Sequence, residues 1–246
     1  METAIAEITH LKKSFGTNQV LKDINFKIEK GENLVVLGKS GSGKSVLIKC
    51  LVGLFEPDGG EVLLFGQNIA GLNDEKLNIL RKKVGFLFQS AALYDSMSVR
   101  ENLEFPLRDL KSKSKEEINA LVVESLNNVG LEGAIDKMPS ELSGGMRKRV
   151  GLARTLILKP EIILYDEPTT GLDPITSNEI SQLILDVQKK YNTASIVITH
   201  DIECARLTAN HMIIIKDGVV LEEGTFEEIS ESKDEWIRSF FNKRKE

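Results

Sequence analysis

Residues 34–52 read LVVLGKSGSGKSVLIKCLV and contain an apolar run, a glycine-rich octapeptide and a second apolar segment. Leu34–Leu37 has the continuous apolar character of a parallel strand that is buried on both faces. Gly38–Ser45 matches the pattern G-x-x-x-x-G-K-[ST], which forms a phosphate-cradling loop between a strand and a helix. Val46–Val52 continues as the expected helix, and Gly53 ends it. This stretch predicts an α/β fold with a phosphate-binding loop at one edge of its sheet.

The residue types in the octapeptide suit a nucleoside triphosphate. Glycines allow successive backbone N–H groups to point at one anion, and the start of the following helix adds its positive dipole end. Lys44 can reach the β- and γ-phosphates, and the Ser45 hydroxyl can coordinate Mg²⁺. A chance glycine-rich turn is the alternative, which the strand before and the helix after disfavour. We therefore expect ATP and Mg²⁺ as ligands, and nucleotide contacts from Gly38, Ser40, Gly41, Gly43, Lys44 and Ser45.

Further strand patterns lie in both halves of the chain. Residues 24–28 alternate between apolar and polar side chains, as in a half-buried strand. An Asp-Gly pair at 217–218 separates two apolar segments and predicts a hairpin turn. Strands alternating with helices favour a mostly parallel sheet. Other strands are expected at residues 61–65, 84–88, 162–165, 195–199, 212–215 and 219–221.

The middle of the chain has a helical pattern instead. Apolar residues between Ile118 and Val129 recur at helical spacing, and Gly130 follows them. The polar run Lys111–Lys115 predicts a surface loop leading into that helix. We expect one domain over 1–246, in which an α/β core (1–90 and 159–246) carries a helical subdomain inserted at 91–158.

Composition narrows the class of protein. Of 246 residues, 41% are hydrophobic and 28% are charged, which is ordinary for a globular protein. The net charge of -5 argues against a general nucleic-acid footprint, so no nucleic-acid partner is expected, although a local basic patch is left open. Cys50 and Cys204 form no C-x-x-C pair, which favours inert thiols in a reducing compartment. We expect neither a signal peptide nor a membrane span, because no apolar run approaches roughly 20 residues.

Two carboxylates follow the apolar run at 162–165. Asp166 and Glu167 would lie at the carboxyl edge of a strand, where sheets of this kind hold ligands. We expect Asp166 to help hold Mg²⁺, through water, and Glu167 to act as the general base on an attacking water. A surface Asp-Glu pair is the alternative, but such a pair need not follow a buried strand.

Together these motifs carry a family resemblance that spans nearly the whole chain. In order they are Phe15, Gly38–Ser45, Gln89, Leu142–Met146, Tyr165-Asp166-Glu167, Gly171-Leu172-Asp173 and His200. The chain resembles the ATPase subunits of ABC (ATP-binding cassette) transporters, which implies a RecA-like P-loop NTPase core with an N-terminal antiparallel β region. The resemblance implies that Phe15 stacks on adenine and His200 contacts the γ-phosphate. It implies that Gln89 senses Mg²⁺ and the γ-phosphate and links to a membrane partner.

A second anion site is expected at Ser143, Gly144 and Gly145, because the free N–H groups of a helix start favour negative charge. The resemblance implies that these residues cover the γ-phosphate held by a second copy of the chain. It also implies that Asp173 crosses the same interface. Two ATP molecules would then be enclosed in a head-to-tail dimer whose closure and opening drive a membrane partner.

Three segments also resemble the lipid-trafficking branch of the family, which works with mammalian-cell-entry (MCE) domain proteins: residues 88–103, 136–142 and 146–150. The resemblance implies two copies of an MlaE-like permease, an MCE-domain protein, an accessory cytoplasmic subunit, and a peripheral position on the cytoplasmic face of a bacterial inner membrane. Phospholipid or another hydrophobic molecule would be the cargo. A polar-solute importer, a non-transport cell-division ATPase and a scaffold without turnover remain alternatives. The basic run Arg147–Arg149 is interpreted as a solvated helix face.

The C-terminal segment Trp236–Phe241 predicts an amphipathic helix, followed by the basic residues Lys243–Lys245. We expect its apolar side to pack onto its own domain. A partner-docking or dimer-clasping tail is the alternative.

Overall fold

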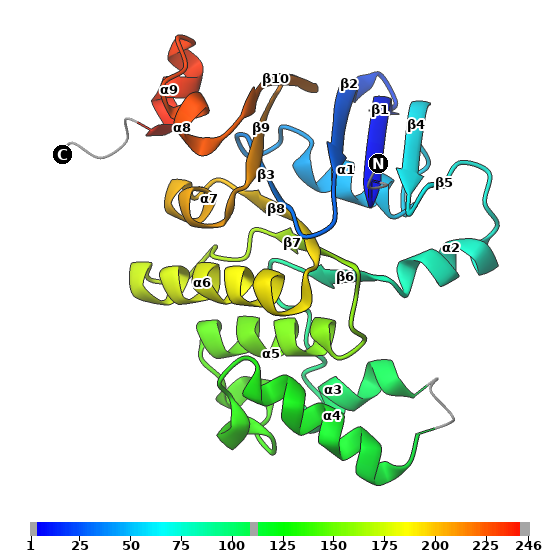
Figure 1. The fold of residues 1–246 in the computed structure, drawn as a ribbon, viewed down its shortest axis with the longest axis vertical. Coiled ribbons are helices and arrows are strands. Elements are labelled where there is room, and N and C mark those ends of the chain that lie inside the picture. The colour runs from blue at the N-terminus through cyan, green and yellow to red at the C-terminus, as the bar shows by residue number, and fades with distance from the viewer. Residues whose placement is uncertain (1–3, 109–112, 242–246) are drawn as a thin grey trace.

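Ten strands form one sheet in the part of the chain that the structure describes, residues 4–108 and 113–241 of this computed structural model (Figure 1). The order across the sheet is β5-β4-β1-β2-β10-β9-β3-β8-β7-β6. The strands are β1 (Ala6–Phe15), β2 (Asn18–Ile28), β3 (Asn33–Leu37), β4 (Gly59–Leu64), β5 (Gln67–Asn68), β6 (Val84–Leu87), β7 (Ile162–Asp166), β8 (Ala194–Thr199), β9 (His211–Lys216) and β10 (Val219–Gly224).

The sheet has an antiparallel and a parallel part. Strand β1 pairs antiparallel with both β2 and β4. Strands β9, β3, β8, β7 and β6 run parallel to one another. Parallel neighbours end at the same edge of the sheet, so the loops that follow β3, β6, β7 and β8 meet there. The expected α/β class, with its antiparallel N-terminal region, is confirmed.

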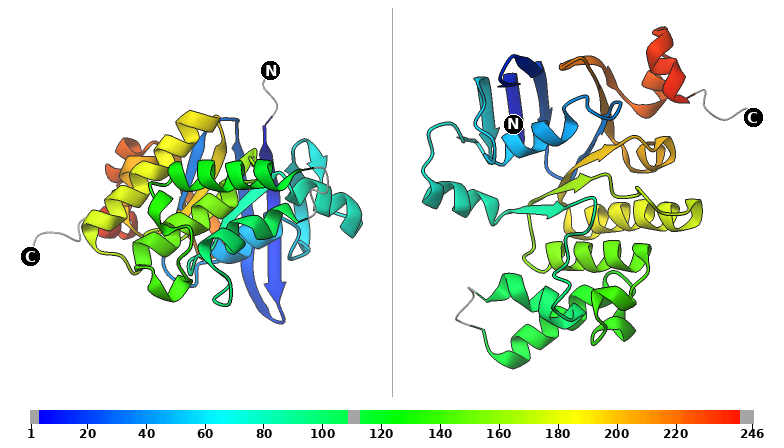
Figure 2. Two further views of the ribbon diagram at one scale, coloured as in Figure 1. Left: turned by 90° about the horizontal axis from the view of Figure 1, so that it is seen from below. Right: turned by 180° about the vertical axis from the view of Figure 1, so that it is seen from behind.

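Helices cover the sheet and extend from one end of it (Figures 1 and 2). They are α1 (Lys44–Leu51), α2 (Asp74–Arg81), α3 (Val99–Glu104), α4 (Lys115–Asn127), α5 (Gly144–Leu156), α6 (Pro174–Tyr191), α7 (Ile202–Thr208), α8 (Phe226–Ser230) and α9 (Glu235–Phe241). The described residues of 91–158 hold α3, α4 and α5, together with the short 3₁₀ turns Phe105–Leu107, Glu132–Ala134 and Pro139–Glu141. That this segment is a separate subdomain stays a prediction.

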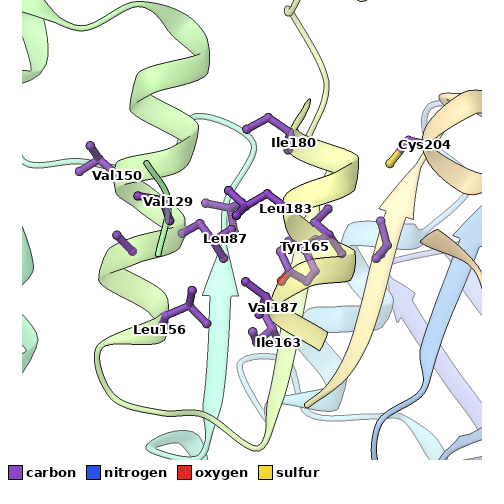
Figure 3. Packing of buried hydrophobic residues seen from close by; sticks show 14 of the residues in the cluster. Leu87, Val129, Val150, Leu156, Ile163, Tyr165, Ile180, Leu183, Val187 and Cys204 are labelled. Atoms are coloured by element: carbon purple, nitrogen blue, oxygen red, sulfur yellow. The ribbon is translucent and has the colours of Figure 1, made fainter. Parts of the chain in front are cut away.

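The parallel strands are apolar on both faces because each face has its own core. Val35 of β3 and Tyr165 of β7 belong to one core with residues of α5 and α6, and Figure 3 shows Tyr165 beside Leu183 and Val187 of α6. Leu34 of β3 packs on the other face with α1 and the antiparallel strands. Side chains alternate between the faces of a strand, so a continuous apolar run is needed to fill both cores.

Several boundaries differ from the sequence predictions. The strand expected at 61–65 covers Gly59–Leu64, because Phe65 adopts a left-handed φ of 52° and begins a turn. Helix α1 begins at Lys44, within the octapeptide itself. Lys115 is the first residue of α4, and Ser114 caps that helix with Glu117; Lys111 and Ser112 lie outside the described residues. Helix α2 was not predicted.

The predicted hairpin and C-terminal helix are confirmed. Asp217 and Gly218 have φ values of 50° and 82°, the positive values that a two-residue turn between β9 and β10 requires. Ile237 of α9 is fully buried against the chain's own core. The basic residues Lys243–Lys245 lie outside the described residues.

Candidate functional site

The glycine-rich loop joins the carboxyl end of β3 to the start of α1. Gly41 and Gly43 have φ values of 81° and 98°, which L-residues with a side chain rarely adopt. A Cβ atom on Gly43 would also lie 2.8 Å from the Leu21 side chain. The ammonium of Lys44 lies inside the loop and donates to the carbonyls of Gly38 at 2.7 Å and Lys39 at 3.1 Å. Burial lowers the pKa of Lys44, while the nearby carboxylates of Glu167 and Asp166 oppose that shift.

Two carboxylates face this loop from the end of β7. Asp166 Oδ1 lies 3.5 Å from Ser45 Oγ. Burial raises the pKa of Asp166, and the neighbouring Glu167 raises it further. The two carboxylates and the Ser45 hydroxyl offer oxygen donors, which Mg²⁺ prefers. A cation here would also offset the repulsion between the partly buried carboxylates. Ser45 and Asp166 would therefore be its protein ligands.

Glu167 is connected to three neighbours. Its Oε2 atom lies 2.7 Å from His200 Nδ1 and accepts a hydrogen bond of 3.2 Å from the Thr170 hydroxyl. Its Oε1 atom lies 3.9 Å from the ammonium of Lys44. Glu167 itself has a left-handed φ of 51°, a conformation that is unfavourable without glycine. The carboxylate is thus held between the phosphate loop and the residue that follows β8.

These groups line one pocket of about 810 Å³. Ten of the residues predicted from the sequence line it: Phe15, Ser40, Gly41, Gly43, Lys44, Ser45, Gln89, Asp166, Glu167 and His200. Phe15 is 45% exposed and meets Phe55 edge-on at 5.3 Å between ring centroids. Gly38 does not line the pocket, but its carbonyl accepts a hydrogen bond from the Lys44 ammonium. One end of the pocket is therefore charged and donor-rich, and Phe15 gives it an aromatic surface.

The remaining predicted residues form a second group outside this pocket. Ser143 caps α5 by accepting from the Met146 N–H at 3.2 Å. A Cβ atom on Gly145 would lie 2.5 Å from Thr176 Cγ2, so this glycine allows α5 to pack closely on α6. Thr176 in turn donates to Asp173 Oδ2 at 2.6 Å. Among the described residues of one chain, Ser143, Gly145 and Asp173 are brought near one another, apart from the chain's own phosphate loop.

The interpretation of Arg147–Arg149 as a solvated face holds for Arg147, which is exposed, but is wrong for Lys148. Lys148 is only 5% exposed, and its ammonium donates to the carbonyls of Gln89 and Glu167, the latter at 3.1 Å. Burial lowers its pKa, against the opposing effect of Asp166 and Glu167. Arg149 donates to the carbonyl of Val129 at 3.0 Å. Lys148 shares its face of α5 with Gly151, Leu152 and Thr155, which are all buried, but only one of these three is a strongly apolar residue, so the sequence carries little signal for the burial of Lys148.

Arg154, a second cation of α5, contacts the same loop. Its guanidinium donates to the carbonyls of Ala91 at 3.0 Å and Ala92 at 2.9 Å. Both alanines have positive φ, 61° and 46°. Helix α5 therefore holds the loop after β6 at two places, with its cap Ser143 at the opposite end from Arg154.

A family model described as ABC transporter matches residues 21–170. The chain belongs to the ABC transporter family. As a member of that family it is an ATPase, and the resemblance read from its motifs is confirmed. No helix among residues 4–108 and 113–241 is long and apolar enough to cross a membrane.

Known relatives of this ABC ATPase differ in the cargo that their names print. It is 41% identical to the probable ribonucleotide transport ATP-binding protein mkl of Mycobacterium leprae, over 97% of this chain and 69% of that protein. It is 39% identical to the intermembrane phospholipid transport system ATP-binding protein MlaF of Haemophilus influenzae, over 95% of this chain and 89% of that protein. The ATP-binding cassette MJ0796, solved as a post-hydrolysis dimer with ADP and Pi, superposes with a TM-score of 0.81 at 34% identity, covering 90% of this chain and 98% of that one.

Proposed function

We propose that ATP binds with its phosphates in the loop Gly38–Ser45 and its base toward Phe15. Lys44 and the loop N–H groups bind the β- and γ-phosphates, while Ser45, Asp166 and Gln89 hold Mg²⁺. When bound, Mg²⁺ supplies positive charge against the phosphate oxygens. The shared pocket of these residues supports this assignment.

We propose that Glu167 is the general base of hydrolysis. A water oxygen forms a bond to the γ-phosphorus, the bond from that phosphorus to the bridging oxygen breaks, and Glu167 takes one proton from the water. ADP keeps the bridging oxygen. His200 orients Glu167 and contacts the γ-phosphate, and Gln89 positions the water and Mg²⁺. The 2.7 Å contact between Glu167 and His200 carries this proposal, because it places two hydrolytic groups together beside Lys44.

We propose that Ser143, Gly144, Gly145 and Asp173 act on the ATP of a second copy of the chain. Their separation from the chain's own pocket supports a site completed in trans, since Ser143, Gly144 and Asp173 are exposed at the starts of α5 and α6, with Gly145 buried between the two helices. A helix start with free N–H groups suits the γ-phosphate of the facing subunit. Two chains would then enclose two ATP molecules head to tail.

We propose phospholipid or another hydrophobic molecule as the cargo. The extent of the match to MlaF, 95% of this chain and 89% of that protein, supports this choice. Two permease copies, an MCE-domain protein and an accessory cytoplasmic subunit are the proposed partners. The ATPase would lie peripherally on the cytoplasmic face of a bacterial inner membrane. The name of mkl, a probable ribonucleotide transport protein, supports a second candidate cargo, a polar solute such as a ribonucleotide.

The hydrolytic assignment is tested by Glu167→Gln, with Glu161→Gln as a matched control at the opposite end of β7. Glu161 is exposed and pairs with Lys83 at 2.9 Å, so its amide should leave turnover unchanged. Glu167→Gln should reduce kcat by about 10²-fold or more while ATP still binds. Steady-state hydrolysis at the normal rate by Glu167→Gln would overturn the assignment of the base.

The cargo is tested by purifying the tagged chain from its native membranes in mild detergent and identifying bound proteins and lipids by mass spectrometry. Recovery of a multi-span permease, an MCE-domain protein and phospholipid supports the lipid assignment. A permease with a polar-solute-binding protein would overturn the cargo and keep the ATPase mechanism. Recovery of cell-division proteins would move the chain to a non-transport role.

A further inference from the structure

The C-terminal helix α9 contributes to the wall of the ATP pocket, although the family motifs do not extend to it. Ser239 and Phe240 line the same pocket as the phosphate loop and Glu167. The two segments are about 200 positions apart in the sequence, so only the fold brings them together. In Figure 1, α8 and α9 lie beside β9 and β10, which are interior strands of the sheet.

Helix α9 is seated firmly enough to form a wall. Ile237 is fully buried, and Phe241 meets Phe226 edge-on at 5.5 Å between ring centroids. The Asp234 carboxylate accepts from the N–H groups of Trp236 at 2.8 Å and Ile237 at 3.1 Å. These contacts leave Phe240 on the side of the helix that borders the pocket.

Trp236 connects the same helix to the phosphate loop. The ammonium of Lys39, within that loop, lies 5.4 Å from the centroid of the Trp236 ring, and that of Lys216 lies 4.7 Å from it. Both distances are within the range of cation–π attraction. Trp236 also meets Phe240 edge-on at 4.9 Å. An aromatic pair therefore extends from a loop lysine to the pocket wall.

We propose that Phe240 is a nucleoside-binding residue, acting in the same chain as the phosphate loop, and that Trp236 reports occupancy of the pocket through Lys39. This inference rests on the proposed binding of ATP at Gly38–Ser45. A phenyl face carries partial negative charge and offers no hydrogen-bond donor, so it is unsuited to phosphate and suited to a flat base. Phe15 and Phe240 give the pocket two aromatic surfaces, whereas its charged groups come from β3, β7 and β8.

The test compares Phe240→Ala with Arg238→Ala, an exposed position on the same helix that does not line the pocket. Affinities for MgATP and for inorganic tripolyphosphate, which has no base, are measured by calorimetry on the folded full chain. Phe240→Ala should weaken MgATP binding about fivefold or more and leave tripolyphosphate binding unchanged. Phe240→Tyr should keep the affinity for MgATP. Arg238→Ala should behave as the unaltered chain.

Trp236 is the single tryptophan of the sequence, so its emission gives a second readout without any label. Saturating MgATP should change that emission. Equal loss of affinity for MgATP and tripolyphosphate in Phe240→Ala, or no loss for either, would overturn the inference while the ATP site stands. Absence of calorimetric ATP binding in the unaltered chain would instead overturn the proposed function. Melting temperatures without nucleotide identify any variant that has lost its fold.

Discussion

Replacing Lys148 by methionine tests whether a buried cation positions the two loops that carry the proposed hydrolytic residues Gln89 and Glu167. The side chain donates to the carbonyls of Gln89 and Glu167, which follow different strands, and it is 5% exposed. Methionine keeps most of the length and the apolar stem but removes every donor. Two hydrogen bonds from a charged group contribute about 1.5–3 kcal/mol each in favourable cases. Methionine also removes the cost of burying an ammonium, so we expect a net stability loss of only about 1–3 kcal/mol.

The larger effect should fall on turnover. Glu167 has a left-handed φ of 51°, and its carbonyl loses a fixed partner when Lys148 is replaced. A displacement of about 1 Å in a reacting group can cost roughly 10²-fold in rate. We expect kcat for ATP hydrolysis to fall by about 10- to 100-fold while KM changes little, because Lys44 and the phosphate loop remain. Lys148→Arg should restore much of kcat, since a guanidinium can donate to both carbonyls.

The assay is steady-state ATP hydrolysis by the assembled transporter, with thermal denaturation of each variant. Arg147→Met is the matched control, because Arg147 is the exposed neighbour on the same helix. A kcat within twofold of the unaltered protein for Lys148→Met would refute the positioning argument. A rise in KM with unchanged kcat would also refute it, because that pattern indicates a loss of ATP binding and not of alignment.

Three further outcomes follow from the buried polar groups. Asp166→Asn should raise the melting temperature of the metal-free protein at pH 7 and abolish Mg²⁺-dependent turnover. The pKa of Asp166 is higher in the folded than in the unfolded chain, so ionisation of this carboxyl disfavours the fold and stability is lost as pH rises through the folded pKa. An amide cannot ionise, and the variant therefore avoids this loss of stability. Asn102→Ala should lower the free energy of unfolding, measured in urea, by about 2–4 kcal/mol. The amide of Asn102 is fully buried, accepts from the Tyr94 N–H and donates to the carbonyls of Tyr94, Met97 and Ser98. An unchanged urea midpoint would refute that account. Cys50 and Cys204 are buried, and burial raises the pKa of each thiol to about 11. Iodoacetamide at pH 8 should therefore modify them only after denaturant is added, as measured by mass spectrometry. Rapid labelling of the folded chain would contradict this.

Local patterns in the sequence were enough to predict the main elements and the glycine-rich loop between β3 and α1. The octapeptide Gly38–Ser45 sets its own backbone geometry through glycines at positive φ, and the Asp217-Gly218 turn does the same for the last hairpin. The apolar runs at Leu34–Leu37 and Ile162–Tyr165 indicated strands buried on both faces, because both cores demand apolar side chains at every position. These features depend on neighbours in the chain, so a sequence pattern can carry them.

Tertiary structure alone decided which of these pieces meet. The order β3-β8-β7-β6 places Lys44, Glu167, His200 and Gln89 around one pocket, and strand order depends on long-range pairing that no local pattern encodes. The burial of Lys148 was missed because a basic run usually indicates solvent, whereas here two backbone carbonyls from distant loops accept from its ammonium. Phe240 likewise joins the pocket only because α9 folds back beside the sheet. The sequence determined which functional groups each segment carries, and long-range packing determined which of these groups lie in the same site.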